Sequence, residues 1–496
     1  MNEQFLDFLQ FQIDWTNQSK SVLDAFSIFQ ITLISSNTKH AERYLSFLFT
    51  LFAMPEISIH DFAHDTLQQL LLTVPLYVLV LIQNKELERI HLFRASTLLC
   101  PIAEQYFPFM TTDKYIQVIY SQNLLRSLSY LPIQRLQFLE IILSKLLRMD
   151  VHASREDIVQ AERFSIENEL VFSLEQLQTN ENDMKHDQAD KLDSFMFILF
   201  EYITKLSNEN GKLNYQQTKS LFKDLLIIFN KYLLPTHDSS HVQFLIFYIC
   251  SFHRDFSDEF INNCWKTFVS PSVSMTFRQA AICYLCSFIA RAKYISIKSV
   301  LTIIQSMVDW LHTYISTTEV NSINSNRHLP FYTICQAVLY IFIYQHEEIA
   351  QLSDGMETVL KWRLNRIISC ELNPLKYCLP AITLGFARLA RNYQIVFCYS
   401  IIEINNRYSL PEVFSFSDYY DHISPILPSH LLHSYFPFDP YVLKRSSMFI
   451  QSIYNDYQDD NDDVHDKNVR EMYETHFAFF QYHFRDKISL KKMMIF

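Results

Sequence analysis

Glycine is almost absent from this chain of 496 residues, since it occurs only at Gly211, Gly355 and Gly385. An average protein of this length has about ten times as many, because glycine makes up about 7% of residues. Parallel α/β enzymes need glycine in phosphate-binding loops, and β-sandwiches need it in hairpins. Three isolated glycines also exclude the phosphate-loop, dinucleotide and hydrolase motifs. The sequence therefore predicts an all-α protein with short polar loops.

The chain also lacks a basic excess and a long apolar run. Lys and Arg total 42 against 53 Asp and Glu, a formal net charge of −11. This balance argues for little or no direct DNA binding and suits a protein that contacts other proteins. The longest apolar run, 70–82, is interrupted by Thr73 and Pro75 and is shorter than the roughly 20 residues that span a bilayer. The start, MNEQFLDFLQ, has no basic region typical of a signal peptide. We expect no membrane attachment.

The nine cysteines show no paired framework, and most lie in apolar helical text. We interpret them as reduced core residues of an intracellular protein. Cys283 and Cys286 form a lone CxxC, but it falls inside a helix that is expected to be buried. A redox pair belongs at a helix N-terminus, and zinc would need a second pair of ligands. The sequence predicts that both cysteines are core residues.

Helical periodicity recurs through most of the chain. In RLQFLEIILSKLLR (135–148) the apolar residues fall on one face of a helix and the polar ones on the other. Segments 278–293 and 331–346 are apolar nearly all round, which predicts helices packed between neighbours on both sides. Asn373-Pro374 and Asp439-Pro440 are typical of helix starts, because an N-cap acceptor precedes a proline.

The spacing of these helices predicts antiparallel pairs about every 40 residues, as in HEAT-like solenoids. No repeated consensus is visible, so a compact helical bundle remains open on periodicity alone. We expect HEAT-like repeats in 1–176 and 194–456. The polar segments 177–193 and 457–471 are expected to be an acidic disordered loop and a second acidic loop. A helical tail is expected in 472–496.

The segment PTHDSSH places two imidazoles, a carboxylate and two hydroxyls within a few positions. His237 and His241 have the i, i+4 spacing of helical zinc proteases. That motif needs a glutamate after the first histidine, where this chain has Asp238, and no third ligand stands out. The segment is better interpreted as the end of helix 221–234 and the cap of the next helix, with Asp238 or Ser239 accepting from free backbone N–H groups. We expect no metal, no cofactor and no catalytic site. A helical metallohydrolase stays as the minor alternative.

Several stretches together resemble a known family. They include PFYTICQAVLYIFIYQH (330–346), QIVFCYSIIEINNR (394–407), YFPFDPYVLKRSSMFI (435–450) and the phrase IARAK (289–293). Their order and content are similar to the RNA polymerase I-specific initiation factor family, called transcription initiation factor IA in animals, with a fungal-type member expected. The resemblance covers about 113–165 and 193–457, while 1–100 fit weakly. Relatives are usually longer, with a long acidic insertion that is reduced here to 177–193.

The resemblance implies a HEAT-repeat superhelix without enzymatic activity, present in the nucleus and nucleolus. It implies that the chain binds the stalk side of RNA polymerase I and bridges the enzyme to promoter-bound core factor for ribosomal RNA transcription, under control by phosphorylation. Another α-solenoid scaffold, such as a transport receptor, is the alternative. Self-association of the free factor stays open.

Two groups of residues are candidates for these roles. Four basic residues are candidate partner contacts: Lys444, Arg445, Arg388 and Arg391. Four serines are candidate phosphorylation sites: Ser121, Ser127, Ser129 and Ser446. We expect Asp439-Pro440 to start a helix that leaves Lys444, Arg445 and Ser446 near its exposed side. On the helix around Arg126, the apolar spacing predicts that only some of the three N-terminal serines are exposed.

Overall fold

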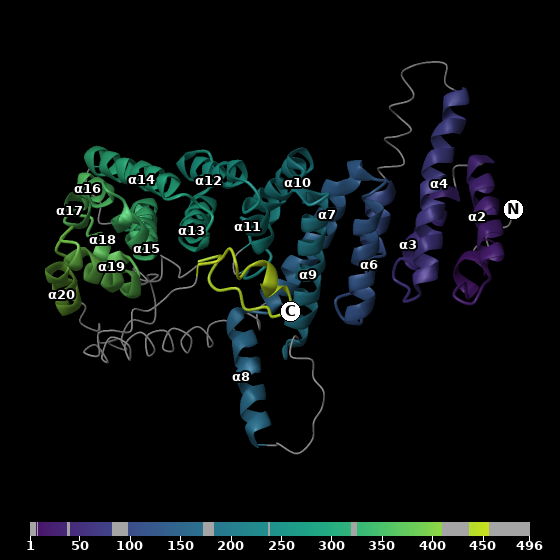
Figure 1. The fold of residues 1–496 in the computed structure, drawn as a ribbon, viewed down its shortest axis with the longest axis horizontal. Coiled ribbons are helices and arrows are strands. Elements are labelled where there is room, and N and C mark those ends of the chain that lie inside the picture. Colours follow the sequence, from purple (N-terminus) through teal and green to yellow (C-terminus); the bar gives the residue numbers. More distant parts are fainter. Residues whose placement is uncertain are drawn as a thin grey trace, which may run out of the picture. The chain divides into compact units, whose positions relative to one another are not determined.

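The structure is a computed structural model that describes residues 6, 8–36, 40–81, 98–171, 183–236, 239–318, 325–408 and 436–455. Its described residues are almost entirely helical, which confirms the predicted all-α class (Figure 1). The chain divides into two compact units. The first comprises 1–263 with 437–453, and the second comprises 264–436 with 454–496. No described helix is long and apolar enough to cross a membrane.

The first unit contains most of the long helices. In chain order its elements are η1 (Phe8–Gln12), α2 (Lys20–Ser36), α3 (Ala41–Leu51), α4 (Ile57–Leu81), α6 (Lys114–Ser127), η3 (Pro132–Gln134), α7 (Arg135–His152), α8 (Arg155–Val171), α9 (Asp187–Ser207), α10 (Tyr215–Ile228), η4 (Phe229–Leu233), α11 (Phe244–Cys250) and η7 (Ser446–Phe449). Helix α12 (Arg254–Val269) contains the boundary between the units.

Helix α9 is the central element of the first unit, because it packs against α6, α7, α10 and α11. Its buried face follows the helical spacing Leu192, Phe195, Met196, Leu199 and Ile203, and all five side chains are buried. Full burial of one such side chain stabilises a fold by about 1.5–3 kcal/mol. Near the N-terminus, Trp15 stacks on Phe26 at 4.1 Å, and the two rings contact Phe47 edge-on.

One of the rare glycines makes the only described strands possible. Strands β1 (Asn208–Glu209) and β2 (Lys212–Leu213) pair antiparallel between α9 and α10. The two residues of the turn, Asn210 and Gly211, have φ of +52° and +77°. A hairpin turn of type I′ requires positive φ angles at both central residues, which Asn-Gly supplies at little cost.

The second unit is built around α15. Its elements are α13 (Met275–Arg291), α14 (Ile297–Thr317), η5 (Ser325–His328), α15 (Leu329–Gln351), α16 (Gly355–Lys361), α17 (Leu364–Ile368), α18 (Pro374–Tyr377), α19 (Pro380–Asn392) and α20 (Tyr399–Tyr408). Helix α15 packs against α13, α14 and α19, so that nearly all of its first fourteen residues are buried. This confirms the prediction that the all-round apolar segment 331–346 lies between neighbours.

The polar segment 177–193 does not form a single loop. Residues 177–182 lie outside the described part, but α9 already begins at Asp187, and the segment lies inside the first unit. The His186 side chain caps α9 by accepting from the N–H of Ala189, and Asp187 and Asp190 lie in the first turn, where carboxylates interact favourably with the helix dipole. The acidic composition thus marks a helix start. The expected segments 457–471 and 472–496 lie outside the described residues.

The predicted helix after Asp439-Pro440 is wrong. Residues 437–445 are irregular, and only a 3-10 turn, η7, follows. The reason is that the backbone groups of this segment bond to residues distant in the sequence instead of forming the hydrogen bonds of a helix. The carbonyl of Pro437 accepts from the side chains of Gln243 and Arg155, while the N–H groups of Arg445 and Ser446 donate to Asp193. At Asn373-Pro374 a helix does start with Pro374, but the Asn373 side chain bonds to Asn405 rather than capping it.

Candidate protein-interaction site

Residues 437–453, here called the return segment, come back to the first unit from late in the sequence. Phe438 is fully buried and contacts the rings of Phe244 and Phe247 on α11. Phe449 contacts Phe197 and Phe200 on α9 at 5.6 and 5.3 Å. Aromatic pairs of this kind add about 0.5–1.5 kcal/mol each beyond the area that they bury. The return segment therefore packs on α9 and α11 of the first unit through its aromatic side chains.

The carboxylate of Asp193 fixes the position of the return segment. It is fully buried in the second turn of α9. One of its oxygens accepts from the N–H of Arg445 at 2.7 Å, and the other accepts from the N–H and the hydroxyl of Ser446. The Ser446 hydroxyl also lies 2.7 Å from the hydroxyl of Tyr441. Burying a carboxylate is costly unless it accepts several hydrogen bonds, and the backbone of 445–446 and the Ser446 hydroxyl supply them.

The basic residues beside Ser446 are engaged within the molecule. Lys444 pairs with Glu162 of α8 at 2.6 Å. The Arg445 guanidinium contacts Asp183 and donates to the hydroxyl of Ser194, and Asp190 lies 3.7 Å away. The prediction that both residues stand on the exposed side of a helix is therefore wrong, because each is half-buried and bound to acidic groups of the same unit.

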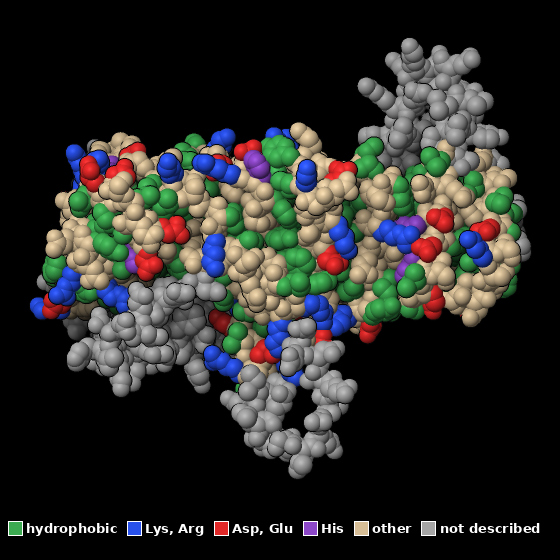
Figure 2. All heavy atoms as spheres, in the orientation of Figure 1, with side chains coloured by type: hydrophobic (Ala, Val, Ile, Leu, Met, Phe, Trp, Pro, Cys, Tyr) green, Lys and Arg blue, Asp and Glu red, His purple; other side chains and the backbone are tan. Residues whose placement is uncertain are grey.

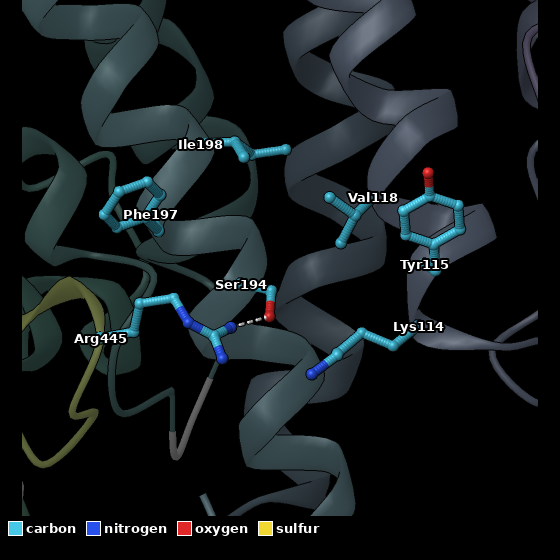
Figure 3. A pocket seen from close by; sticks show the side chains of 7 residues that line it. All are labelled: Lys114, Tyr115, Val118, Ser194, Phe197, Ile198 and Arg445. Carbon is cyan, nitrogen blue, oxygen red and sulfur yellow. Dashed lines mark hydrogen bonds between the residues drawn. The ribbon is translucent and has the colours of Figure 1, made fainter. Parts of the chain in front are cut away.

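Arg445 also lines a hollow between α6 and α9 (Figure 3). The hollow has a volume of about 230 Å³. It is lined by Lys114, Tyr115, Val118, Ser194, Phe197, Ile198 and Arg445. Figure 3 shows Lys114, Tyr115 and Val118 on one side, Ser194 and Ile198 facing them from α9, and Phe197 on the side of α9 near Arg445. Helices α6 and α9, which are distant in sequence, and the return segment thus build one site.

A second buried carboxylate, Asp150, explains the chemical-looking segment PTHDSSH. Asp150 lies near the end of α7 and is fully buried, as is His241. It accepts from the N–H groups of Ser240, His241 and Val242 at 2.8–3.1 Å, and from Nδ1 of His241 at 2.9 Å. The acceptor for these N–H groups therefore comes from α7, and not from Ser239 as the sequence suggested. Asp238 and His237 lie outside the described residues.

Burial and the hydrogen bond to Asp150 together determine the charge of the His241 imidazole. Burial lowers the pKa of His241, although the Asp150 charge opposes the shift. Burial alone would raise the pKa of Asp150, but the hydrogen bonds that it accepts from His241 and Val242 bring the pKa below its usual value. A neutral imidazole that donates to a buried carboxylate is a structural pair. Within the described ranges, no group of three or more His, Cys, Asp and Glu could hold a metal ion.

The CxxC has the environment of core cysteines. Cys286 is buried, and its thiol donates to the carbonyl of Cys283 within α13. Burial raises the pKa of Cys283 to about 12, whereas a reactive thiol needs a lowered pKa. All nine cysteines are free. Cys286 is therefore the core residue that the sequence predicts, whereas Cys283 is only partly buried.

The remaining candidates divide by exposure. Arg388 and Arg391 are exposed on α19 of the second unit, so both are accessible to a partner. Ser121 and Ser127 are fully buried on α6 and donate to carbonyls of their own helix, and Ser446 is buried on Asp193. A kinase cannot reach these three in the folded protein. Ser129 is exposed in the turn after α6.

Asp150, Asp190 and Asp193 were missed as functional residues at the level of sequence. Their partners lie 91, 76 and more than 250 positions away in the chain, so that no local spacing could pair them. One signal was available. Two carboxylates, Asp187 and Asp190, lie just before the apolar period that begins at Leu192, which is typical of a helix N-terminus.

Comparison with known proteins gives a consistent result. A family model described as RNA polymerase I specific transcription initiation factor RRN3 matches residues 8–462. The RNA polymerase I-specific transcription initiation factor RRN3 of Mus musculus is 33% identical over 490 residues, which covers 92% of this chain and 73% of that protein. The corresponding factor of Schizosaccharomyces pombe is 26% identical over 487 residues and covers 90% of this chain and 75% of that protein.

A solved structure shows the same fold. The crystal structure of RNA polymerase I transcription initiation factor Rrn3 aligns with a TM-score of 0.70 and 22% identity, over 89% of this chain and 83% of that chain. The all-α, helical repeat-like fold is thereby confirmed. The family match begins at residue 8, which corrects the weak fit that the sequence suggested for 1–100. The expectation that the chain is a fungal-type member stays a prediction. The sequence identity does not support it, because the chain is 33% identical to the mouse protein and 26% identical to the fission yeast protein.

Proposed function

Because the chain belongs to the family of RNA polymerase I-specific transcription initiation factors, we propose that it is the adaptor that makes RNA polymerase I competent to initiate at ribosomal RNA promoters. The observation that carries this proposal is the family match over 8–462. The resemblance noted in the sequence is confirmed at the level of the family. The relatives are initiation factors rather than enzymes, which confirms that a catalytic role is not expected.

In the proposed function the chain binds the stalk side of RNA polymerase I and bridges the enzyme to promoter-bound core factor. It acts in the nucleus, and within it in the nucleolus. Direct DNA binding contributes little, in keeping with the net charge of −11. An α-helical scaffold with a large surface suits such bridging, because helical repeats present extended faces to protein partners.

Reconstitution tests the proposal. A tagged full-length chain is mixed with purified RNA polymerase I and, separately, with core factor. We expect it to retain both and to restore promoter-directed transcription by polymerase depleted of the factor. Retention of core factor without polymerase, or transcription that does not need the chain, would contradict the proposal.

Phosphorylation is proposed to control polymerase binding, and exposure narrows the site to Ser129 among the four candidate serines. Ser129 lies three residues after Arg126, which pairs with Asp61 of α4 at 2.7 Å. A phosphate carries about −1.5 to −2 charges at pH 7 and would compete with Asp61 for this guanidinium. We expect Ser129→Asp to weaken polymerase binding about tenfold, or about 1.4 kcal/mol.

Two matched variants complete this test. Ser129→Ala should bind polymerase like the wild type, and both Ser129 variants should keep the wild-type unfolding midpoint. Ser127→Asp places a charge in the core and should lower that midpoint. Equal polymerase binding by Ser129→Asp and Ser129→Ala would remove Ser129 from the proposal.

A further inference from the structure

The hollow between α6, α9 and Arg445 has the size of one large side chain. Its volume of about 230 Å³ is below the roughly 300–1,000 Å³ of pockets that hold small-molecule ligands. Val118, Phe197 and Ile198 give it an apolar lining, and the Tyr115 ring, 55% exposed, stands at its edge. Bulky side chains that enter such hollows anchor protein interfaces.

The charged groups of the lining are both cations. Lys114 forms an ion pair with Asp190. The Lys114 side chain is 35% exposed and that of Asp190 is 16% exposed, so that a partner contacts the ammonium group before the carboxylate. Arg445 is held by Ser194 and by Asp183, which is itself 42% exposed. Figure 2 shows Lys and Arg side chains gathered near the lower ends of α6 and α9. Fixed cations lose little conformational freedom when a carboxylate approaches them.

An exposed aromatic residue lies beside the same helices. Phe109, 83% exposed, is in the loop before α6. The loop is fixed, because Gln117 donates to the carbonyls of Phe109 and Thr112, and Lys191 of α9 donates to those of Met110 and Thr112. The loop therefore holds the Phe109 ring at a fixed position at the surface, beside α6 and α9.

We propose that this hollow is the docking site for a protein segment that inserts one bulky apolar side chain and presents flanking carboxylates to Lys114 and Arg445. The inference deepens the proposed function and rests on it in taking the partner to be RNA polymerase I. The return segment is required for docking, because it supplies Arg445 and because Phe449 supports Phe197 from behind. Docking therefore occurs only while the return segment is in place.

The test measures binding of purified RNA polymerase I to the full-length chain. Val118→Arg fills the hollow and Lys114→Glu reverses its charge, and each should lower the affinity at least tenfold. Ile133→Arg, at an apolar position 76% exposed in the same unit, and Lys205→Glu, at the other end of α9, are the controls. Lys205 is paired with Glu201, as Lys114 is with Asp190. Both controls should bind like the wild type.

A second measurement does not depend on these substitutions. Benzoylphenylalanine in place of Tyr115 is irradiated in the complex, and the cross-linked peptide is sequenced. It should carry an aromatic or large aliphatic residue within a few positions of Asp or Glu. A wild-type chain that does not bind polymerase overturns both the proposed function and the docking site. Wild-type binding with undiminished affinity in Val118→Arg and Lys114→Glu, or a cross-link to a basic peptide, overturns the docking site alone.

Discussion

Asp150 and Asp193 are two fully buried carboxylates in the same unit, and they hold different kinds of segment. Asp150, at the end of α7, organises the junction 239–242, which leads directly into α11. Asp193, at the start of α9, holds the return segment at Arg445 and Ser446. Both accept mainly from backbone N–H groups. Only Asp150 also has an ionisable partner, His241.

The two carboxylates also differ in their position along the helix. A carboxylate in the first turns of α9 is favoured by the helix dipole, whereas one near the end of α7 is opposed by it. Asp150 therefore depends more on its donors than Asp193 does. A buried carboxylate can thus either be part of the continuous core or hold a segment that could leave the surface as one piece. Four substitutions separate these two roles.

The largest effect is expected for Asp150→Ala. It leaves the N–H groups of 240–242 and the His241 imidazole without their acceptor inside the core. Four buried donors then lose their acceptor, and each costs about 1–3 kcal/mol when left unpaired. The free energy of unfolding of the first unit should therefore fall by at least about 3 kcal/mol in a urea titration.

Asp258→Ala is the matched control, because it removes a carboxylate from an exposed pair with Arg254 on α12. Such surface pairs contribute about 0–1 kcal/mol. An equal loss in Asp150→Ala and Asp258→Ala would show that the donors at 240–242 find another acceptor, such as water.

Asp193→Ala should have a smaller and more local effect, about 2–3 kcal/mol from the buried donors left unpaired. The cost is limited because the return segment can leave the surface and expose its N–H groups to water. Amide hydrogen exchange should therefore rise in 441–450 while α7 and α11 stay protected. Faster exchange spread evenly over the first unit would mean that the return segment belongs to the continuous core, as the junction at Asp150 does.

Acidification should act on the Asp150 cluster through His241. Burial lowers the pKa of His241, so below pH about 6.5 the unfolded chain binds a proton that the folded chain does not. Stability should then fall between pH 7 and pH 5 by up to about 1.4 kcal/mol per pH unit for this group. The lowered pKa of Asp150 also makes stability fall as the pH falls, but this contribution is lost only below pH about 3.8, the usual pKa of an aspartate.

His241→Asn should reduce this slope, since asparagine can still donate to Asp150 but does not titrate. His64, whose pKa burial lowers to about 4, contributes in the same direction, so His64→Gln serves as a second measurement of the same kind. An unchanged slope in His241→Asn would show that the imidazole is protonated in the folded state.

The all-α class and the buried helix α15 could be predicted from the sequence, because both follow from local properties. With three glycines, the chain has few places for the tight turns that sheets and phosphate-binding loops need. A helical segment of sixteen residues that is apolar all round must be covered by neighbours on all sides. The helix start at Asp187 was hidden, because its acidic first turn has the composition of a loop.

The site could not be predicted in the same way. Lys444 and Arg445 look like an exposed basic end, and only the fold shows that Glu162 and Asp183 meet them. In PTHDSSH the residues that attract attention are adjacent, whereas the acceptor that explains them is Asp150. Side chains that are brought together by tertiary packing leave no spacing in the chain.

The smallest effect is expected for Tyr441→Phe, which tests whether the two clusters are separate. The Tyr441 ring contacts His241 edge-on at 5.5 Å, and its hydroxyl lies 2.7 Å from that of Ser446. Burial holds the pKa of Tyr441 well above its usual value, so the hydroxyl remains a donor to Ser446, which in turn donates to Asp193. Phenylalanine keeps the ring contact with His241 and removes only this bond, at a cost of about 0.5–1.5 kcal/mol.

Double-mutant cycles then decide between one network and two. If the clusters are separate, Tyr441→Phe should be non-additive with Asp193→Ala by about 0.5 kcal/mol or more, and additive with Asp150→Ala within about 0.3–0.5 kcal/mol. The free energies come from urea titrations of all single and double variants at pH 8, where the imidazole of the unfolded chain is also neutral. Equal coupling of Tyr441 to both carboxylates would join the junction and the return segment into one polar network, and Asp193 could then no longer release its segment alone.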